Sequence, residues 1–355
     1  MKRVGQLWES LVSFENLLVA ANAAAAGKRS RPDVSRFILN LEPELLGLRR
    51  ELRDGSYLPG PYRSFEIQDP KPRRISAAPF RDRVIHHALT QMLAPIFEKR
   101  FSPCSYACRT GFGSHRALRA ASQGCHDHPY VLKCDVRKYF ASMDHEILNG
   151  LLSRVIKCRP TLELARCIIR GSNPQEEIIQ YFPGDDLFAP FERRRGLPLG
   201  NQTSQFFANL YLDPLDQSVK RQRKVPVCVR YVDDLLVFGR TASELHETRE
   251  CVEELLCSLR LTLHPRKTQI LRTVDGVTFL GWRLFPNRKR LVRANAVQFR
   301  RRMRTMVAQY SVGAIDWDEI QCRVNAWIAH AAHGNTFRLR EQLLEEFAFA
   351  RGKAV

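Results

Sequence analysis

The sequence of 355 residues has no apolar run long enough to span a membrane. Its ten cysteines include no C-x-x-C pair, and the spacing of Cys104 and Cys108 to His126 and His128 is poor for zinc. We therefore expect no membrane partner, no structural zinc site and no disulfide framework, and we place the chain in a reducing, cytoplasmic compartment.

Acidic residues are also scarce in this chain. It has 37 Asp and Glu against 56 Lys and Arg, which gives a net charge of +19 at pH 7. Such an excess favours a polyanionic partner, most often nucleic acid, over a merely soluble basic surface. Residues 288–304 contain many Arg and Lys and no acid at all, so we place a domain boundary at about residue 286.

The N-terminus superficially has the composition of a secretory signal peptide. Glu9, Glu15 and Asn16 interrupt its apolar part, which argues against that interpretation. The apolar residues are spaced as on one face of a helix: Trp8, Leu11, Phe14, Leu17 and Leu18. We expect residues 1–60 to form a helical N-terminal extension, followed by units at 61–129, 130–285 and 286–355.

Several segments have clear local patterns. Residues 130–136 (YVLKCDV) predict a buried strand, and residues 225–239 predict two short strands around a tight turn. Helices are expected after Pro79, after residue 142, and after Gly200, and Thr241 with Glu244 is a capping box for another. Residues 259–264 and 276–285 are strand-like, and residues 171–195 favour an irregular hairpin.

The turn between the two short strands carries adjacent carboxylates in the sequence Tyr231-Val-Asp-Asp. Carboxylate oxygens are ligands that Mg²⁺ prefers, and a cation offsets their mutual repulsion. Two-metal nucleotidyl transfer needs a further carboxylate, and Asp135 at the end of the 130–136 strand is the candidate. A solvated turn for Asp233 and Asp234, and a strand-end cap for Asp135, are the structural alternatives.

These segments together resemble a reverse transcriptase over nearly the whole chain. YVDD resembles the family's Y-x-D-D box, CDVRKYF its first-aspartate motif, and RRISAAPFRDRVIHHAL a fingers motif. YACRTGFGSHRAL, LHPRKT and FLGW follow in the family's order as the next block, the lysine motif and the primer grip. The resemblance implies an α+β right-hand polymerase: fingers at 61–129, an antiparallel palm sheet backed by helices at 130–285 with fingers elements at about 150–195, and a basic helical thumb at 286–355.

The resemblance also implies roles for individual residues. Two Mg²⁺ ions, with Mn²⁺ as a possible substitute, would be held by carboxylates and one main-chain carbonyl: Asp135, Val136, Asp233 and Asp234. The incoming dNTP would contact Arg74, Lys138, Tyr139, Phe140, Leu199, Gly200 and Lys267. Template RNA and the primer or cDNA strand would contact Arg109, Gln205, Asn209, Tyr231, Leu280, Gly281, Arg300, Arg301 and Arg304. Phe140 would exclude a 2′-hydroxyl. The structural alternatives are a core aromatic for Phe140, surface cations for Arg74 and Lys267, and a solvated helix face for the arginines after residue 299.

One stretch departs from the common family pattern. Most reverse transcriptases have Gln-Gly, three residues and Ser-Pro before the palm helix, whereas this chain has LGNQTSQ, with Leu199 for Gln and Gln205 for Pro. This form, and the N-terminal segment, resemble the reverse transcriptases of diversity-generating retroelements. That group implies a bacterial or phage-encoded enzyme, errors at template adenines, mutagenic retrohoming into a variable gene region, and a small basic oligomeric accessory variability protein.

Other interpretations stay open at this point. The residues after 286 are too few for an RNase H domain, and no Cys- and His-rich tail or long maturase region is evident. A stripped group II intron-like enzyme, an antiphage-defence reverse transcriptase and a catalytically idle RNA-binding scaffold are the alternatives. Intact Asp135, Asp233 and Asp234 argue against the scaffold.

Overall fold

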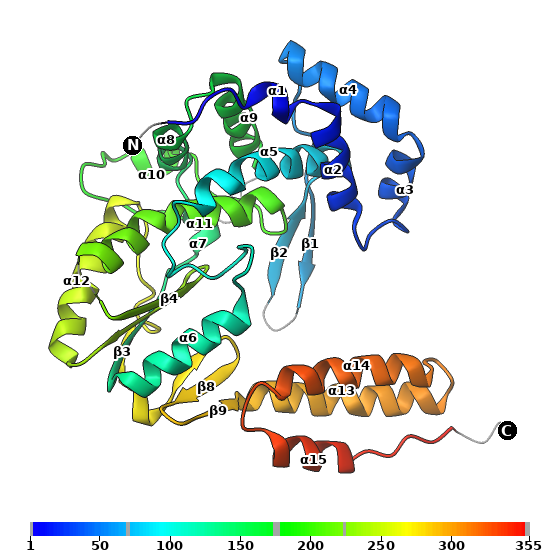
Figure 1. Cartoon of the computed structure of the whole chain (residues 1–355), viewed down its shortest axis with the longest axis vertical. Helices are drawn as coiled ribbons and strands as arrows, with labels where there is room; N and C mark the ends of the chain where they lie inside the picture. The colour runs from blue at the N-terminus through cyan, green and yellow to red at the C-terminus, as the bar shows by residue number, and fades with distance from the viewer. Residues whose placement is uncertain (1–2, 69–71, 173–177, 223–224, 352–355) are drawn as a thin grey trace.

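The computed structural model describes residues 3–68, 72–172, 178–222 and 225–351 (Figure 1). The N-terminal extension is helical, as predicted: α1 (Trp8–Leu11), α2 (Phe14–Ala25), α3 (Pro32–Leu39) and α4 (Leu41–Asp54). Ser13 caps α2, and the apolar face of α2 packs on the long α5 (Phe80–Glu98). Leu11 and Leu17 are fully buried there, so the predicted apolar stripe faces the core.

A two-stranded antiparallel ribbon lies between this extension and α5. It consists of β1 (Arg63–Ile67) and β2 (Arg73–Ala77), and every residue of β1 is exposed. In Figure 1 the ribbon projects from the helices toward the open space above the C-terminal helices. Pro79 then precedes α5, as the sequence predicts.

The central sheet has four antiparallel strands in the order β4-β5-β3-β6. These are β3 (Tyr130–Asp135), β4 (Val227–Tyr231), β5 (Asp234–Gly239) and β6 (Gln269–Arg272). Helices α11 (Gln202–Gln217) and α12 (Ala242–Ser258) belong to the same apolar core, and the predicted Thr241–Glu244 capping box begins α12. Mixed helix and antiparallel sheet agree with the expected α+β class.

In the described part of the chain, five further helices and two short turns lie in the region between α5 and β7. They are α6 (Ser114–Asp127), α7 (Tyr139–Ser142), α8 (His145–Val155), α9 (Arg159–Arg170) and α10 (Ala189–Glu192), with short turns η1 (Ser218–Gln222) and η2 (Thr273–Asp275). Helix α6 packs against β4 and against β8 (Trp282–Phe285) of the next sheet, and so joins the two sheets. Within the described residues, no helix is both long enough and apolar enough to pass through a bilayer.

A second sheet of three strands leads into the C-terminal helices. It contains β7 (Val277–Phe279), β8 (Trp282–Phe285) and β9 (Arg288–Leu291), followed by α13 (Arg293–Ser311), α14 (Trp317–Ala331) and α15 (Phe337–Glu345). The backbone amide of Asn335 donates to Lys289 O at 2.9 Å, and Gly334 lies so close to the Trp282 ring that a Cβ would not fit. The expected boundary at 286 falls in the β8–β9 turn, inside this sheet.

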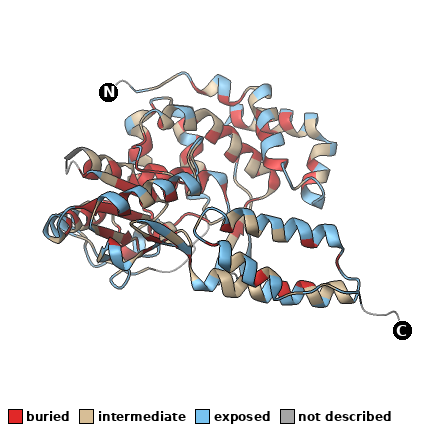
Figure 2. Cartoon of the chain, turned by 60° about the horizontal axis from the view of Figure 1, so that its bottom comes forward, coloured by how far each residue is buried: buried red, intermediate tan, exposed pale blue. Residues whose placement is uncertain are grey.

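Figure 2 shows how differently the two halves are buried: red buried residues fill the sheet and N-terminal helices, whereas the C-terminal helices are largely exposed. Two local predictions were wrong: residues 178–195 contain α10 and no strand, and residues 259–264 contribute only a bridge from Leu263 to Val136. Strand β9 was not predicted. Residues 173–177 of the expected hairpin lie outside the described residues.

Candidate active site

The β4–β5 hairpin presents Asp233 and Asp234 at one edge of the central sheet. Tyr231 pairs with Asp234, which leaves Val232 and Asp233 as a two-residue turn. Val232 has φ of +59°, a left-handed conformation that a β-branched residue rarely adopts. The first position of such hairpin turns is normally glycine, so the turn is strained where the carboxylates are displayed.

The third carboxylate arrives by strand pairing. Strand β3 lies antiparallel to β5, and the register places Asp135 directly opposite Asp234. Residues that are far apart in the sequence therefore meet at the same sheet edge, as expected from the two strand ends. Opposite residues in an antiparallel pair have Cβ atoms about 4.5–5.5 Å apart, so the two carboxylates are close neighbours.

Asp233 and Asp234 both have raised pKa values. Burial is the largest cause for Asp233, followed by the charges of Asp234 and Asp135, and together they raise the Asp233 pKa to about 6. Burial also raises the Asp234 pKa, and the positive charge of Lys133 partly offsets this. The sheet edge therefore carries crowded negative charge that a cation would stabilise.

Lys267 supplies part of that positive charge. Its Nζ lies 2.9 Å from Asp135 Oδ1 and 3.0 Å from Oδ2, in a pair that is partly exposed. The loop that carries Lys267 is held to the end of β3, because the His264 amide donates to Asp135 O at 2.7 Å. The sequence predicted Lys267 near the dNTP, and the structure places it on the carboxylate cluster itself.

The donor set suits a divalent cation by its chemistry, since hard carboxylate oxygens crowd together in a partly buried place. In the described parts of the chain, however, no group of three or more His, Cys, Asp or Glu side chains is arranged to hold a metal ion. Asp135 is instead engaged by Lys267. These carboxylates, with the carbonyl of buried Val136, would hold the ions only once that ion pair is exchanged.

A cavity of about 580 Å³ opens beside Asp233. It brings together most of the predicted dNTP group, and its lining is Glu66, Pro72, Arg73, Arg74, Lys138, Tyr139, Phe140, Ala141, Leu199 and Asp233. The β1–β2 ribbon provides the cationic wall, the turn after β3 provides the aromatic wall, and the sheet edge provides the acid. Cations, a flat apolar surface and carboxylates thus face one space of nucleotide size.

The walls of this cavity are fixed to each other by the main chain. The Ser76 amide of β2 donates to Leu199 O at 3.0 Å, and the Asn201 side chain donates to Ser76 O at 3.3 Å. Gly200 has φ of +111°, and a Cβ there would lie 3.0 Å from Ile75. Leu199 therefore packs beside the ribbon and lines the cavity at the same time.

Tyr139 and Phe140 have different surroundings. The Tyr139 side chain is buried, and its hydroxyl donates to Ala208 O at 2.5 Å, which anchors the turn to α11. Phe140 is only half-buried and lies on the cavity wall, with its ring 5.6 Å from that of Tyr139. Of the two aromatics, Phe140 is the one free to contact a sugar.

The predicted template and primer residues are not gathered in one place. Gln205 is exposed and accepts from the Cys108 thiol at 3.4 Å, and Tyr231 is half-buried on β4. Arg109 pairs with Glu98 at 2.8 Å, and its side chain is only 4% exposed. Asn209 is buried and donates to Ala107 O at 2.7 Å. Contact of Arg109 or Asn209 with nucleic acid would require these internal bonds to open. In this geometry both side chains hold neighbouring segments of the protein together.

Leu280 and Gly281 form the β7–β8 turn, with φ of +47° and +82°. Gly281 O accepts from the Val292 amide at 3.1 Å and from the Asn295 side chain at 3.2 Å, so the turn is tied to the start of α13. The Lys133 side chain donates to Thr278 O at 2.7 Å and joins this sheet to β3. The expected primer-grip turn is thus held between the central sheet and the C-terminal helices.

The three predicted arginines of α13 are in part already paired. Arg300 and Arg304 lie 2.7 and 3.6 Å from Glu346. Arg301 is exposed and lines a hollow of about 880 Å³ between α13 and α14, together with Arg323 and Trp327. Basic side chains beside an apolar floor are a common surface for nucleic acid backbone.

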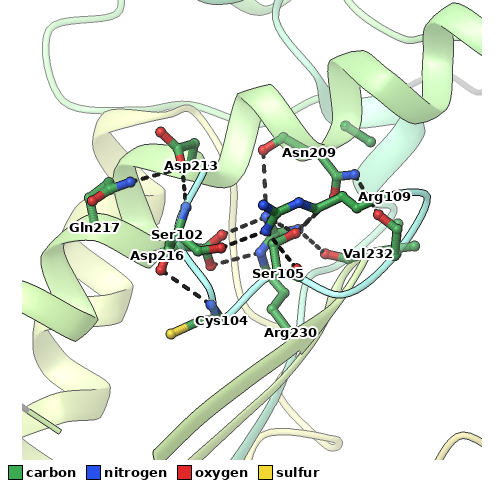
Figure 3. Close-up of polar contacts among 12 residues, drawn as sticks. Ser102, Cys104, Ser105, Arg109, Asn209, Asp213, Asp216, Gln217, Arg230 and Val232 are labelled. Carbon is green, nitrogen blue, oxygen red and sulfur yellow. Dashed lines mark hydrogen bonds and ion pairs between the residues drawn. The ribbon is translucent and has the colours of Figure 1, made fainter. Parts of the chain in front are cut away.

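Sequence reasoning missed Arg230, which lies on β4 just before Tyr231. Figure 3 shows its guanidinium in the middle of a polar network under the turn, where Asp216 of α11 accepts two hydrogen bonds from it. Both side chains are essentially fully buried. The signal was an arginine inside the apolar stretch VPVCVRYV, since a charge rarely lies in a buried strand without a partner.

Comparison with known proteins agrees with this geometry. The family described as reverse transcriptase (RNA-dependent DNA polymerase) matches residues 67–284. This range includes β3, β4 and β5 and the three acids Asp135, Asp233 and Asp234. Protein YkfC of Escherichia coli (strain K12) is 27% identical over 290 residues, covering 70% of this chain and 73% of that protein.

Two further relatives have printed names that refer to introns. Group II intron-encoded protein LtrA of Lactococcus lactis subsp. cremoris is 26% identical over 211 residues, covering 59% of this chain and 33% of that protein. Nuclear intron maturase 1, mitochondrial, of Arabidopsis thaliana is 33% identical over 94 residues, or 26% of this chain and 13% of the relative. The chain thus spans only a small part of these longer relatives. The family match over more than half of the sequence shows that the chain belongs to the reverse transcriptase (RNA-dependent DNA polymerase) family.

Proposed function

We propose that this protein copies a template RNA into cDNA by two-metal nucleotidyl transfer at Asp135, Asp233 and Asp234. The observation that carries the proposal is the strand register, which sets Asp135 against Asp234 beside a cavity lined by Arg74 and Phe140. Two bound Mg²⁺ ions, or Mn²⁺ in their place, would activate the attacking hydroxyl and stabilise the leaving oxygen.

The remaining work belongs to the chain's own side chains. Arg74 and Lys138 lie on the cavity wall where they would bind a triphosphate, and their positive charge would stabilise the charge that spreads over its oxygens. Phe140 would lie against the sugar and exclude a 2′-hydroxyl. Lys267, once released from Asp135, would be available to the same phosphates.

Template and primer would run between the turn at Leu280 and Gly281 and the basic α13–α14 surface. Arg301 and its neighbours would bind backbone phosphates without reading sequence. In this arrangement the C-terminal helices act as a thumb, the central sheet as a palm and the β1–β2 ribbon as part of the fingers.

The direct test is primer extension on an RNA template with dNTPs and Mg²⁺. The unaltered protein should extend the primer, and Asp233→Asn should reduce the rate at least about 100-fold, because the loss of metal positioning removes several kcal/mol of transition-state stabilisation. Asp275→Asn, at an exposed acid on η2, is the matched control and should change the rate little.

Circular dichroism and RNA affinity should be the same for Asp233→Asn and the unaltered protein. Extension by Asp233→Asn within about threefold of the unaltered rate would reject the assignment, since so small a change is under 1 kcal/mol. No extension by the unaltered protein would favour the idle RNA-binding scaffold.

For the subclass we propose a diversity-generating retroelement enzyme, on the sequence LGNQTSQ at 199–205 and the N-terminal extension. It would act in the cytoplasm of a bacterium or in phage-infected cells, make errors at template adenines, serve mutagenic retrohoming and work with a basic accessory protein. The intron-named relatives favour the second candidate, a stripped intron-type enzyme. Sequencing cDNA made from one template decides between them, because only the first predicts errors concentrated opposite adenine.

A further inference from the structure

The guanidinium of Arg230 contacts three separate parts of the protein. Its Nε and one terminal nitrogen donate to the two carboxylate oxygens of Asp216 on α11, at 2.7 and 2.6 Å. The same terminal nitrogen donates to Ser105 Oγ at 3.0 Å. The other terminal nitrogen donates to Val232 O at 2.9 Å (Figure 3). Arg230 therefore links the helix, the 102–109 loop and the turn that bears Asp233.

The main chain of Arg230 strengthens the same link. Its amide donates to Cys104 O at 2.6 Å, and its carbonyl accepts from the Tyr106 amide at 2.9 Å. Asn209 completes the network by accepting from Ser105 Oγ at 3.1 Å. The loop is thus bonded through Cys104, Ser105 and Tyr106 to the residue that immediately precedes Tyr231.

Stability alone does not explain such a pair. Arg230 is 0% exposed and Asp216 is 1% exposed, and moving two charges into the protein interior costs about as much as their attraction returns. Apolar residues of similar size in these positions would often be as stable or more so. Among the hydrogen bonds that apolar residues could not replace, the one to Val232 O reaches the turn that bears Asp233.

That carbonyl belongs to the peptide bond between Val232 and Asp233. Val232 is in the left-handed region, where valine is disfavoured, so the turn would relax to another conformation without a partner that holds it. A fixed carbonyl fixes the peptide plane and, with it, the direction in which the Asp233 side chain leaves the main chain.

We propose that Arg230, oriented by Asp216, is a positioning residue that holds the strained Val232 turn and so sets the place of the Asp233 carboxylate relative to Asp135. The inference rests on the proposed function, in which the Asp233 carboxylate binds a metal ion. It adds two residues to the site that touch neither nucleotide nor metal and act through the turn.

The test replaces the ion pair by apolar side chains of similar length, in the double variant Arg230→Met with Asp216→Leu. Its matched control is Arg193→Met with Asp185→Leu, a second ion pair whose side chains are 6% and 7% exposed and which lies outside the nucleotide cavity. Both variants remove an internal Arg–Asp pair, and the control also removes the 3.4 Å contact of Arg193 with Asp144, but only the first variant releases Val232 O.

Hydrogen exchange, extension kinetics and substrate binding together distinguish a positioning role from a purely structural one. Hydrogen exchange of the 227–239 segment should be at least about tenfold faster at the turn in the first variant and unchanged in the control. The extension rate should fall about 10- to 100-fold, and the Mg²⁺ concentration for half-maximal rate should rise, as for other residues that orient a metal ligand. Affinity for primer–template and the KM for dNTP should stay within about threefold, because the Arg74 wall is untouched.

A folded first variant with unchanged exchange, rate and Mg²⁺ requirement would overturn the proposal. If that variant does not fold, Arg230→Lys takes its place, since it keeps the charge but loses the two-pronged geometry, and the same exchange and Mg²⁺ results are expected. Hydrogen exchange needs no activity, so it remains informative if the unaltered protein makes no cDNA. That outcome rejects the proposed function, whereas unchanged turn exchange rejects the positioning role.

Discussion

Two hairpins face the same cavity, and they are built in opposite ways. The β4–β5 hairpin carries Asp233 and is almost wholly buried, with β5 forming an inner strand of the central sheet. The β1–β2 ribbon carries Arg74, forms a separate two-stranded sheet, and exposes every residue of β1. Isolated two-stranded ribbons are marginally stable by themselves, whereas inner strands move least.

This difference suits the chemistry that each hairpin would perform. Carboxylates that hold metal ions must keep their geometry to within a fraction of an ångström, so they belong on a packed sheet. A cation that grips a diffusing triphosphate gains from a support that can move toward it and close. The Ser76–Leu199 and Asn201–Ser76 hydrogen bonds join the last part of β2 to the chain before α11.

The largest expected difference between the two hairpins is in how much each contributes to the free energy of unfolding. Leu236→Ala in β5 should cost about 2–5 kcal/mol of unfolding free energy, because a fully buried leucine leaves a cavity in the sheet. Phe65→Ala in β1 should cost less than about 0.5 kcal/mol, since this side chain is 47% exposed. Urea unfolding of both variants provides the numbers, and equal costs would show that the ribbon is as firmly packed as the sheet.

The second prediction concerns the ribbon's charge. Arg74→Ala should lower kcat/KM for dNTP about 10- to 100-fold, mainly through KM, because a charge-assisted contact of about 1.5–3 kcal/mol is lost. Arg63→Ala, on the same ribbon but outside the cavity lining, is the matched control and should change neither constant. Steady-state extension at varied dNTP measures both, and an equal effect of the two variants would mean that the ribbon contributes only general positive charge.

The third prediction uses the raised pKa of Asp233. Because this pKa is about 6 in the folded protein and lower in the unfolded chain, protonation favours folding, and that contribution is lost as pH rises through about 6. Metal binding needs the ionised form, so at limiting Mg²⁺ the extension rate should fall up to about tenfold per pH unit below 6. Saturating Mg²⁺ should move this fall to lower pH. Identical profiles at both Mg²⁺ concentrations would mean that another group governs the pH dependence.

The smallest predicted effect is at Leu199, where the ribbon meets the site. Leu199→Gln adds a polar group beside the nucleotide cavity, and a contact of about 0.5–1.5 kcal/mol that depends on correct geometry should raise fidelity about threefold to tenfold. The change should be clearest opposite template adenine, an expectation that comes from the family resemblance. Sequencing cDNA copied from one template by both proteins measures it, and equal error spectra at similar rates would leave Leu199 with a packing role.

The sequence predicted the sheet edge well because the relevant signals are local. The apolar runs of 130–136 and of 225–239 predict strands, and β3 ends at Asp135 while β5 begins at Asp234. Antiparallel pairing of β3 with β5 then brings the acids together. Six predicted residues, namely Arg74, Lys138, Tyr139, Phe140, Leu199 and Asp233, line one cavity.

The sequence did not predict contacts between distant segments that have no pattern of their own. Nothing in LHPRKT indicates that Lys267 would pair with Asp135, which lies 132 residues away along the chain. Asn209 was expected at the template because it lies in a family motif, yet α11 turns it inward to the network around Arg230. The strand-like pattern of 259–264 was also misleading, because that segment packs on the end of β3 and does not join the sheet beyond one bridge.

The junction between the second sheet and the C-terminal helices has a practical consequence for protein engineering. The turn after α14 packs on that sheet through Gly334 against Trp282 and Asn335 against Lys289, so β7–β9 and the helices form one interlocked piece. A chimaera that took its C-terminal helices from a relative would lose these contacts if it were joined at residue 286 or 292. The same graft joined before Val277 would carry β7–β9, Gly334 and the turn after α14 together. It would therefore keep the contacts between the sheet and the helices.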